Sequence, residues 1–333
     1  MLDTAVCGLG WWGKQVAQVL KGNAKINIVC GVDPMQETRE AWAKQTGLPT
    51  HDSFEKALAD PKVKAVILTT PHSLHEQQVL AAAAAGKQIF CEKPLSLTAD
   101  SARRMIEACR AKGLIMGLGH ERRWEPAMLR LREIVAAGEL GEILHVEANM
   151  SHDKFAPLKA DNWRGSKKDA PAAGWTGMGV HLSDMMISLI GPVVEVHSYS
   201  AKRVLPLPSG DVISVHLRFA DETTGHIAAV SATPFFARFA VWGSKGWVEI
   251  RETEHVESPA ATHFYRRMTG QKETHELIQP GDPVRANFEA WADAVEGRGT
   301  YPFTDVHRMA NVAVLEALVR SVDSGRPEMV EQL

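Results

Sequence analysis

The sequence predicts an α/β protein in two parts: a doubly wound parallel sheet, then an α/β domain with a large, mainly antiparallel open sheet. Up to about residue 120, apolar runs alternate with helical stretches, which is typical of a doubly wound sheet. A glycine-rich turn joins the first run to the first helical stretch. After Gly141 the runs become rich in β-branched and aromatic residues, which favours antiparallel strands. We therefore expect domains at residues 1–120 and 121–333, with the final helices as candidates to pack back on the first.

In the first domain, predicted strands and helices alternate along the chain. The expected strands are Thr4–Cys7, Ile26–Val32, Ala65–Thr69, Gln88–Cys91 and Leu114–Leu118. The expected helices between them are Lys14–Leu20, Gln36–Gln45, Ser73–Ala84 and Thr98–Ala111. Asp100 and the nearby Ser and Thr residues provide N-capping groups for the last of these helices.

The second domain is expected to be rich in strands. Its predicted strands are Ile143–Asn149, Val193–Ser200, Val212–Phe219, Gly225–Val230, Ala237–Trp242 and Trp247–Arg251. The run Gly243-Ser244-Lys245-Gly246 fits a hairpin turn between the last two strands. The polar stretch from Glu252 to Pro283 contains prolines and glycines, and we interpret it as an excursion or long loop. Helices at Val284–Val295 and Asp305–Ser324 are expected to close the chain.

The run Gly8-Leu9-Gly10-Trp11-Trp12-Gly13 has the G-x-G-x-x-G spacing of a dinucleotide-binding turn. It follows a strand-like run and opens a helix, which is the setting that this motif requires. Gly8 permits the tight turn, Gly10 lets the backbone approach a pyrophosphate, and Gly13 lets the helix pack close to the strand. The helix N-terminus then faces the anion. We expect a Rossmann domain in which these glycines, Trp11 and Trp12 bind the coenzyme.

Asp33 ends the second apolar run, at the distance where an acidic side chain accepts hydrogen bonds from the adenosine ribose. Its charge would repel a 2′-phosphate, and the next residue is Pro34 where a cation would favour NADP. We therefore expect NAD as the cofactor and prefer it to NADP, while Arg39 is near enough in sequence to approach the same place.

Two further loops are expected at the carboxyl edge of the first sheet, where a Rossmann coenzyme lies. In the first loop Thr70, Pro71 and His75 are candidates for the nicotinamide side, with an ordinary first-turn histidine as the alternative reading of His75. The second loop is Glu92-Lys93-Pro94. A lysine that is out of bulk water and near a positively charged nicotinamide should have a lowered pKa. Such a group suits the proton transfer that accompanies hydride transfer.

The run Gly179-Val180-His181-Leu182-Ser183-Asp184 opens an apolar helix. His181 and Asp184 are three residues apart and share one helix face, so both can point into one cleft.

Together these segments resemble the glucose–fructose oxidoreductase / inositol dehydrogenase family, called Gfo/Idh/MocA. The residues that carry the likeness are the glycine loop ending at Gly13, Asp33, Thr70-Pro71 with His75, Glu92-Lys93-Pro94, Arg122-Arg123, Trp163-Arg164, and His181 with Asp184. The resemblance implies hydride transfer between NAD(P) and a carbon of a sugar, cyclitol or related polyol. It implies Lys93 and His181 as the acid/base pair, and Arg164 and Glu92 near the cofactor. Asp184, Thr176, Arg123 and Trp163 are expected to bind the substrate.

The sequence departs from the family pattern at one position. Many members carry an aspartate four residues before the histidine, where this chain has Gly177. Either Thr176 or Asp184 replaces its polar contacts, or a simpler Lys–His pair suffices. The tryptophans Trp163 and Trp175 indicate a less hydrophilic pocket than a cyclitol would favour.

Composition and charge narrow the possible partners. The chain has 333 residues with a formal net charge of −3 and no basic tract, so nucleic acid and membrane are not expected as partners. With no signal-like start and no long apolar run, we expect a cytoplasmic protein. The four cysteines are expected to be reduced core residues, and no metal is required because the nicotinamide takes the hydride. A homo-dimer or homo-tetramer through the open sheet is expected.

Three alternatives stay open. The first is a dehydrogenase of a cyclic dihydrodiol or another ring-derived catabolite. The second is a redox-sensing NAD-binding protein without turnover. In the third, NAD is tightly held and recycled within one turnover.

Overall fold

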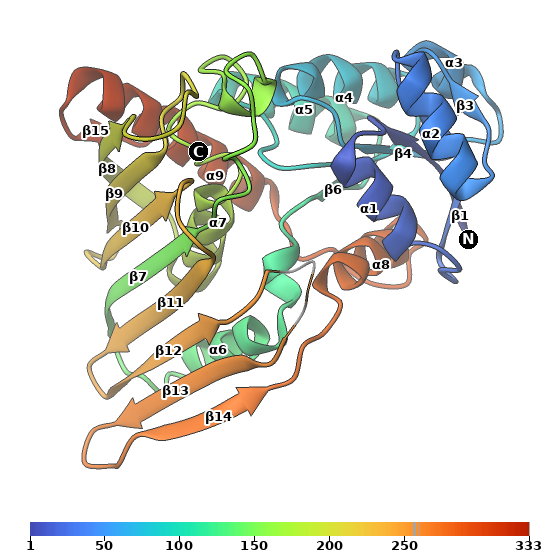
Figure 1. Cartoon of the computed structure of the whole chain (residues 1–333). Coiled ribbons are helices and arrows are strands. Elements are labelled where there is room, and N and C mark those ends of the chain that lie inside the picture. Colours follow the sequence, from blue (N-terminus) through green and yellow to red (C-terminus); the bar gives the residue numbers. More distant parts are fainter. Residues whose placement is uncertain (256–257, 259, 333) are drawn as a thin grey trace. The chain divides into compact units, whose positions relative to one another are not determined.

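The computed structural model describes residues 1–255, 258 and 260–332, and these residues form two compact units. The N-terminal unit consists of Met1–Glu121 together with Val284–Arg308. The C-terminal unit consists of Arg122–Pro283 together with Met309–Leu333. Each unit is built around its own sheet, as Figure 1 shows.

The N-terminal unit holds a parallel sheet, whose strands within the described residues lie in the order β3-β2-β1-β4-β5-β6. These strands are β1 (Leu2–Cys7), β2 (Ile26–Val32), β3 (Thr50–His51), β4 (Ala65–Leu68), β5 (Gln88–Cys91) and β6 (Met116–Leu118). The helices of the unit are α1 (Trp11–Val19), α2 (Gln36–Thr46), α3 (Phe54–Ala59), η1 (His72–Leu74), α4 (His75–Ala84), α5 (Ala99–Ala111) and α8 (Pro283–Val295). The strand order reverses between β1 and β4, so the carboxyl ends of these two strands form the crevice of a doubly wound fold.

Helix α8 packs against the end of this first sheet, although it lies far along the chain. The indole N–H of Trp291 donates to the carbonyl of Ile115 at 2.9 Å, and Asn287 donates to the carbonyl of Leu118 at 2.9 Å. Gly117 in β6 leaves room for the Trp291 ring, since a Cβ there would lie 2.9 Å from it. One predicted closing helix therefore belongs to the N-terminal unit.

The C-terminal unit holds a mixed sheet, whose described strands lie in the order β14-β13-β12-β11-β7-β10-β9-β8-β15. Strand β7 pairs with β10 in parallel, and the other pairs are antiparallel. The strands are β7 (Ile143–Ser151), β8 (Val193–Ala201), β9 (Val212–Phe219), β10 (Thr224–Val230), β11 (Phe236–Gly243), β12 (Gly246–Glu252), β13 (Thr262–Met268), β14 (Thr274–Ile278) and β15 (Glu328–Met329).

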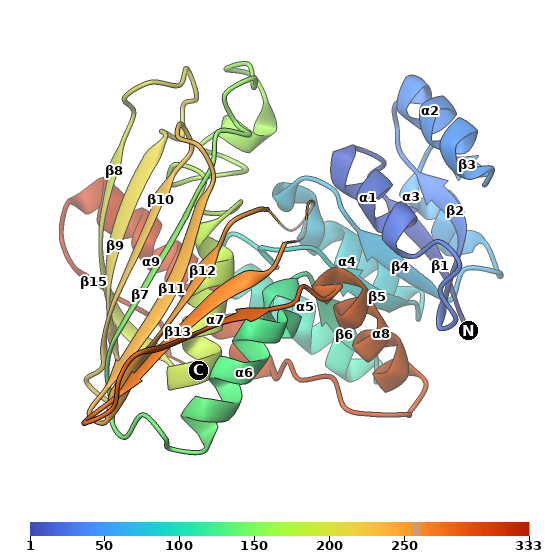
Figure 2. The same ribbon diagram turned by 60° about the horizontal axis from the view of Figure 1, so that its bottom comes forward.

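Helices cover one face of this sheet. The helical segments are η2 (Glu121–Trp124), α6 (Pro126–Ala136), η3 (Trp163–Gly165), α7 (Gly179–Ile190) and α9 (Asp305–Ser324). Helix α7 packs on β7 and β10, and Figure 2 shows α6 and α7 on the same side of the sheet. Ser198 on the buried face of β8 donates its backbone N–H to Ser321 of α9 at 2.9 Å. Along β7 to β10, buried residues alternate with more exposed ones, so the opposite face carries half-buried and exposed side chains.

The predicted strands and closing helices are confirmed in outline, and one prediction is wrong. Ile26–Val32, Gln88–Cys91, Val212–Phe219 and Asp305–Ser324 have the bounds expected from the sequence. The stretch from Glu252 to Pro283, interpreted as an excursion or long loop, contains the strands β13 and β14, which were not predicted. Strand β14 is exposed along most of its length at the edge of the sheet, so it lacks the alternation of apolar and polar residues that marks a strand.

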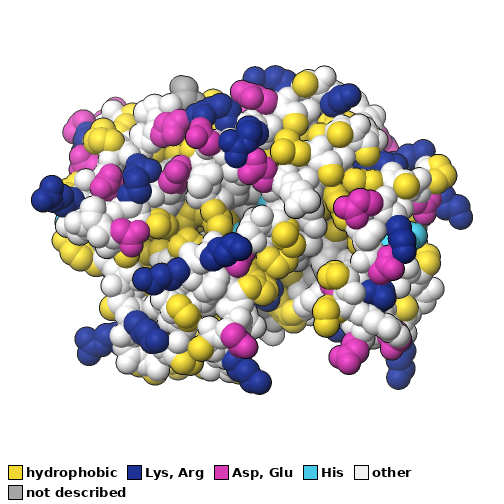
Figure 3. All heavy atoms as spheres, turned by 90° about the horizontal axis from the view of Figure 1, so that it is seen from above, with side chains coloured by type: hydrophobic (Ala, Val, Ile, Leu, Met, Phe, Trp, Pro, Cys, Tyr) yellow, Lys and Arg dark blue, Asp and Glu magenta, His cyan; other side chains and the backbone are white. Residues whose placement is uncertain are grey.

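Charged side chains of both signs lie on the surface of the described residues. On the face in Figure 3, Lys and Arg side chains are interspersed with Asp and Glu. Every helix within the described residues is too short or too polar to span a bilayer. The four cysteines are buried and unbridged, as predicted, and burial raises the pKa of the Cys91 thiol well above its ordinary value.

Candidate functional site

The glycine loop after β1 has the geometry that a dinucleotide requires. Gly8 has a φ of +93°, and a Cβ there would lie 2.8 Å from the carbonyl oxygen of Thr69. A Cβ on Gly13 would overlap the carbonyl oxygen of Gly8. By contrast, a Cβ on Gly10 would meet no described atom within 4 Å, so open space lies in front of the backbone at that position. The first and third glycines are therefore needed for packing, and the second leaves room for a ligand.

The start of α1 provides donors for an anion. Gly10 is the N-cap residue and has no side chain to satisfy the first N–H groups of the helix. Trp11 and Trp12 follow, with ring centroids 5.4 Å apart, and Trp11 is 47% exposed. Open space beside uncapped helix N–H groups fits the pyrophosphate of NAD, for which Gly8, Gly10 and Gly13 would form the turn.

Asp33 holds the glycine loop and the end of β2 together. One carboxylate oxygen accepts from the backbone N–H of Leu9 at 2.9 Å, and the other accepts from that of Met35 at 2.9 Å. Arg39 donates to the backbone carbonyls of Asp33 and Pro34, at 2.8 and 2.9 Å. The carboxylate thus has a fixed position at the carboxyl edge of the sheet, where each oxygen keeps a further lone pair for a ribose hydroxyl.

The loops after β4 and β5 are joined through His75. Its Nδ1 lies 3.0 Å from the carbonyl oxygen of Pro94, and its Nε2 lies 3.2 Å from that of Thr70. The side chain is fully buried, and burial lowers its pKa. His75, a candidate for the nicotinamide side, thus ties the backbone just after Lys93 to the loop after β4. Thr70 and Pro71 lie in the first of these loops, as expected.

Glu92 precedes Lys93, and its carboxyl group is buried within the N-terminal unit. Burial, aided by the negative charge of Glu121, raises the pKa of Glu92 from 4.5 to about 7, against the opposing charge of Lys93. The nearby indole N–H of Trp12 lowers this pKa, although it makes no hydrogen bond of normal geometry with any residue that the structure describes. Gly119 leaves room for the carboxyl group, because a Cβ there would lie 2.6 Å from Cδ of Glu92.

Glu92 should make the protein less stable as pH rises from 4.5 to about 7. In this range the unfolded chain has lost the Glu92 proton while the folded protein still binds it, so acid favours the folded state. Glu92→Gln cannot ionise and should gain roughly 2 to 3 kcal/mol in free energy of unfolding over the wild type between about pH 5 and about pH 8. Urea denaturation measures this change. The exposed substitution Glu107→Gln is the control, and parallel curves for Glu92→Gln and wild type would contradict the prediction.

In the C-terminal unit, Asp184 and Arg123 form a buried ion pair. Arg123 donates from Nε and Nη2 to the two carboxylate oxygens of Asp184, at 2.7 and 2.6 Å. The two side chains are 3% and 2% exposed. The pair links η2 to α7 close to His181, which is itself buried. Both residues were expected to bind substrate. In the structure they bind each other.

The segment before α7 has an unusual backbone. Ala172, Ala173 and Gly174 are consecutive left-handed residues, with φ values of 60°, 49° and 82°. The left-handed region is costly for alanine, so the surroundings must hold this turn in place. The backbone N–H of Ala173 donates to the carbonyl of Ser209 at 2.7 Å. The turn leads into Trp175 and Thr176, which are both buried.

Trp163 and Arg164 lie in η3, between β7 and α7. The guanidinium carbon of Arg164 lies 4.4 Å from the centroid of the Trp163 ring, and burial lowers the pKa of Arg164. Arg122, next to Arg123, donates to both carboxylate oxygens of Glu252 at 2.6 and 2.9 Å. Arg122, one of the residues that carry the family likeness, is thus held by an ion pair within the C-terminal unit.

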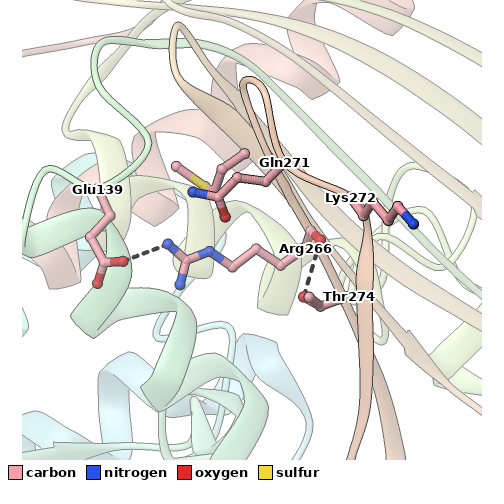
Figure 4. Close-up of a pocket in the computed structure, with 6 residues that line it drawn as sticks. Glu139, Arg266, Gln271, Lys272 and Thr274 are labelled. Atoms are coloured by element: carbon pink, nitrogen blue, oxygen red, sulfur yellow. Dashed lines mark hydrogen bonds and ion pairs between the residues drawn. The ribbon is translucent and has the colours of Figure 1, made fainter.

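A hollow of about 380 Å³ lies beside the edge hairpin of the second sheet. Figure 4 shows its lining, which consists of Glu139, Arg266, Met268, Gln271, Lys272 and Thr274. Arg266 pairs with Glu139 at 2.5 Å across it. The residues predicted for the site do not line this hollow, so it is not the predicted site.

The structure brings the coenzyme candidates of the N-terminal unit together at one sheet edge. The glycine loop, Asp33 and Glu92-Lys93 directly follow β1, β2 and β5, and Thr70 is the second residue after β4. Lys93 belongs to the N-terminal unit and His181 to the C-terminal unit, and their convergence stays a prediction. Sequence reasoning missed two residues, Glu121 and Phe155. Their proximity to Glu92 and to Gly177 is a tertiary contact that motif spacing does not signal.

The parallel sheet and the glycine loop define a protein with a dinucleotide-binding Rossmann domain. Residues 2–120 match the family model described as "Oxidoreductase family, NAD-binding Rossmann fold", and residues 128–249 match the model of the GFO/IDH/MocA C-terminal domain. The chain belongs to the Gfo/Idh/MocA family of NAD-binding oxidoreductases, as the sequence resemblance indicated.

Relatives along nearly the whole chain include two named enzymes. The chain is 26% identical to 1,5-anhydro-D-fructose reductase of Ensifer adhaerens over 308 residues, which is 91% of each protein. It is 28% identical to scyllo-inositol 2-dehydrogenase (NAD(+)) of Bacillus subtilis over 343 aligned residues, which cover 98% of this chain and 96% of the relative. The solved structure of levoglucosan dehydrogenase with NADH superposes with a TM-score of 0.87, covers both chains completely and is 20% identical, so it supports the fold alone.

Proposed function

We propose that this protein oxidises a secondary alcohol on a sugar, cyclitol or related cyclic polyol to a ketone with NAD, reversibly. The observation that carries the proposal is the position of Lys93, which directly follows β5 at the same sheet edge as the glycine loop and Asp33. The related 1,5-anhydro-D-fructose reductase and scyllo-inositol 2-dehydrogenase support a ring substrate.

In this proposal each group has a defined task. Bound NAD would accept the hydride that leaves the carbinol carbon. The Lys93 amine takes the proton of the substrate hydroxyl group. The oxygen of that group becomes the carbonyl oxygen of the product. His181 donates a hydrogen bond to that oxygen and so helps to hold it beside Lys93. His75 fixes the backbone just after Lys93 through the carbonyl of Pro94, and it ties that backbone to the loop after β4 through the carbonyl of Thr70.

The buried ion pair changes the roles proposed for two residues. Because Arg123 occupies both oxygens of Asp184, the pair serves to hold the start of α7 and thereby to position His181. Thr176 and Trp163 remain proposed substrate contacts. Arg164 remains a proposed coenzyme contact, and its burial against Trp163 gives it a defined orientation.

A panel of alcohols tests the reaction. The panel contains sugars, cyclitols, anhydro-sugar alcohols and cyclic dihydrodiols, each with NAD and with NADP, and formation of the reduced coenzyme is followed by absorbance. We expect turnover of a ring polyol with NAD, at a kcat/KM at least about tenfold above that with NADP, because Asp33 disfavours a 2′-phosphate. Selective oxidation of dihydrodiols would support the alternative substrate class. Coenzyme binding without turnover of any alcohol would contradict the proposal and favour a sensor.

We also propose that a second copy of the chain covers the outward face of the C-terminal sheet. That face carries paired charges and histidines, with Arg238 bridging Glu147 and Glu249 at 2.9 and 2.7 Å, and His216 next to His226. A face that carries both positive and negative side chains can pair with the same face of a second copy, as the two-fold symmetry of a dimer requires. A mass by light scattering equal to one chain would contradict it.

A further inference from the structure

An aromatic ring fills the space next to Gly177. A Cβ on Gly177 would lie 2.8 Å from Cζ of Phe155, and a Cβ on Gly174 would lie 3.1 Å from Cε2 of the same ring. Phe155 therefore lies over both glycines, and a side chain at position 177 has room only if this ring moves. The ring is half-buried, so part of it is available to a ligand.

Both apolar and polar groups lie near this ring: a Cβ on Gly174 would also lie 3.2 Å from Cε of Met178 and 2.7 Å from Oγ of Ser231. Trp175 and Met178 are fully buried, and Nε1 of Trp175 has no hydrogen-bond partner among the described residues. His152 meets the Phe155 ring edge to face, with centroids 5.3 Å apart. Within this cluster, position 177 lacks the carboxylate that would accept hydrogen bonds from substrate hydroxyls.

Gly177 and His181 belong to the same end of α7. Met178 is the N-cap of this helix and His181 is its third residue, while the backbone N–H of His181 donates to the carbonyl of Met178 at 3.1 Å. The Phe155 ring thus lies beside the residue that precedes the N-cap of α7, at the helix end that carries the proposed acid/base histidine.

We propose that Phe155 determines substrate choice by presenting an aromatic wall that selects ring alcohols with a continuous C–H face over fully hydroxylated rings. The inference rests on the proposed function. An aromatic face contacts C–H groups well, whereas a hydroxyl group turned toward it loses water without gaining a partner. Anhydro and deoxy sugars and sparsely hydroxylated carbocyclic alcohols are the class that this wall fits.

Matched ring compounds test the inference. One pair is cis-cyclohexane-1,2-diol and myo-inositol, and the other is 1,5-anhydro-D-glucitol and D-glucose. For the protein loaded with NADH, calorimetric titration gives the affinity for each compound, and steady-state assays with NAD give kcat and KM. We expect the wild type to favour the less hydroxylated member of a pair at least about tenfold in both affinity and kcat/KM, which is the size of effect that apolar pockets produce.

Three variants distinguish a role of Phe155 in substrate choice from a general loss of folding or binding. Phe155→Ser should reduce the preference about tenfold, mainly through KM and affinity, with a smaller change in kcat. Phe155→Ser combined with Gly177→Asp has room for a carboxylate and should reverse the preference toward the hydroxylated ring. The control Phe236→Ser alters an exposed ring on β11 and should leave the preference unchanged.

The two readouts distinguish this inference from the proposed function. If Phe155→Ser abolishes a binding preference while the wild type oxidises none of the compounds, the inference stands and the proposed oxidation fails. If the preference ratio of Phe155→Ser stays within about twofold of wild type, the inference is overturned while the oxidation stands. Failure of every compound to bind the wild type would also overturn it.

Discussion

Lys93→Met should lower kcat/KM by roughly a hundredfold to ten-thousandfold, which is the contribution expected of a general acid/base group. Methionine keeps the length of the side chain but cannot take the hydroxyl proton. Lys93 is half-buried in the loop after β5, with His75 fixing the carbonyl of the next residue, so the substitution should leave the loop in place. NADH affinity, measured by fluorescence titration, is expected to change little, because the glycine loop and Asp33 are untouched.

The control for this substitution is Lys62→Met, which removes an exposed lysine of the same unit and should keep full activity. A Lys93→Met protein that retains more than about a tenth of wild-type kcat/KM would remove Lys93 from the role proposed. Loss of NADH binding together with activity would show that Lys93 acts in binding.

Arg123→Met should lower the free energy of unfolding by roughly 3 to 5 kcal/mol, since it leaves the Asp184 carboxylate buried without its partner. The comparison is Arg130→Met, which breaks a pair with Glu276 whose side chains are 45% and 43% exposed. Exposed pairs contribute at most about 1 kcal/mol. Urea denaturation followed by circular dichroism measures both. Equal, small losses in the two variants would contradict the assignment of the Arg123–Asp184 pair as a buried support.

The double substitution Arg123→Met with Asp184→Leu separates stability from positioning. Removing both charges should restore most of the lost stability, because apolar residues replace a buried ion pair without leaving a charge. If the pair also orients His181, the restored protein should still show reduced kcat with nearly unchanged coenzyme affinity. Full activity in the double variant would limit the pair to a structural role.

The sequence was sufficient for features that depend on local pattern. Alternating apolar runs predicted Ile26–Val32 and Gln88–Cys91, because buried parallel strands are apolar on both faces. The glycine spacing predicted the turn after β1, since only residues without Cβ fit beside Thr69 and the backbone of Gly8. The edge hairpin β13–β14 escaped prediction, because an exposed edge strand need not alternate apolar and polar residues.

The sequence by itself determined the family and the coenzyme domain, because these follow from motifs in which a few neighbouring residues meet one requirement. Only the tertiary structure showed that Asp184 is occupied by Arg123, that His75 supports two loops, and that Phe155 covers Gly177. The contacts of Asp184 with Arg123, of His75 with Pro94 and of Phe155 with Gly177 each join residues 19 or more positions apart. The packing of helices and strands decides which of these residues meet, and no local sequence pattern predicts such a contact.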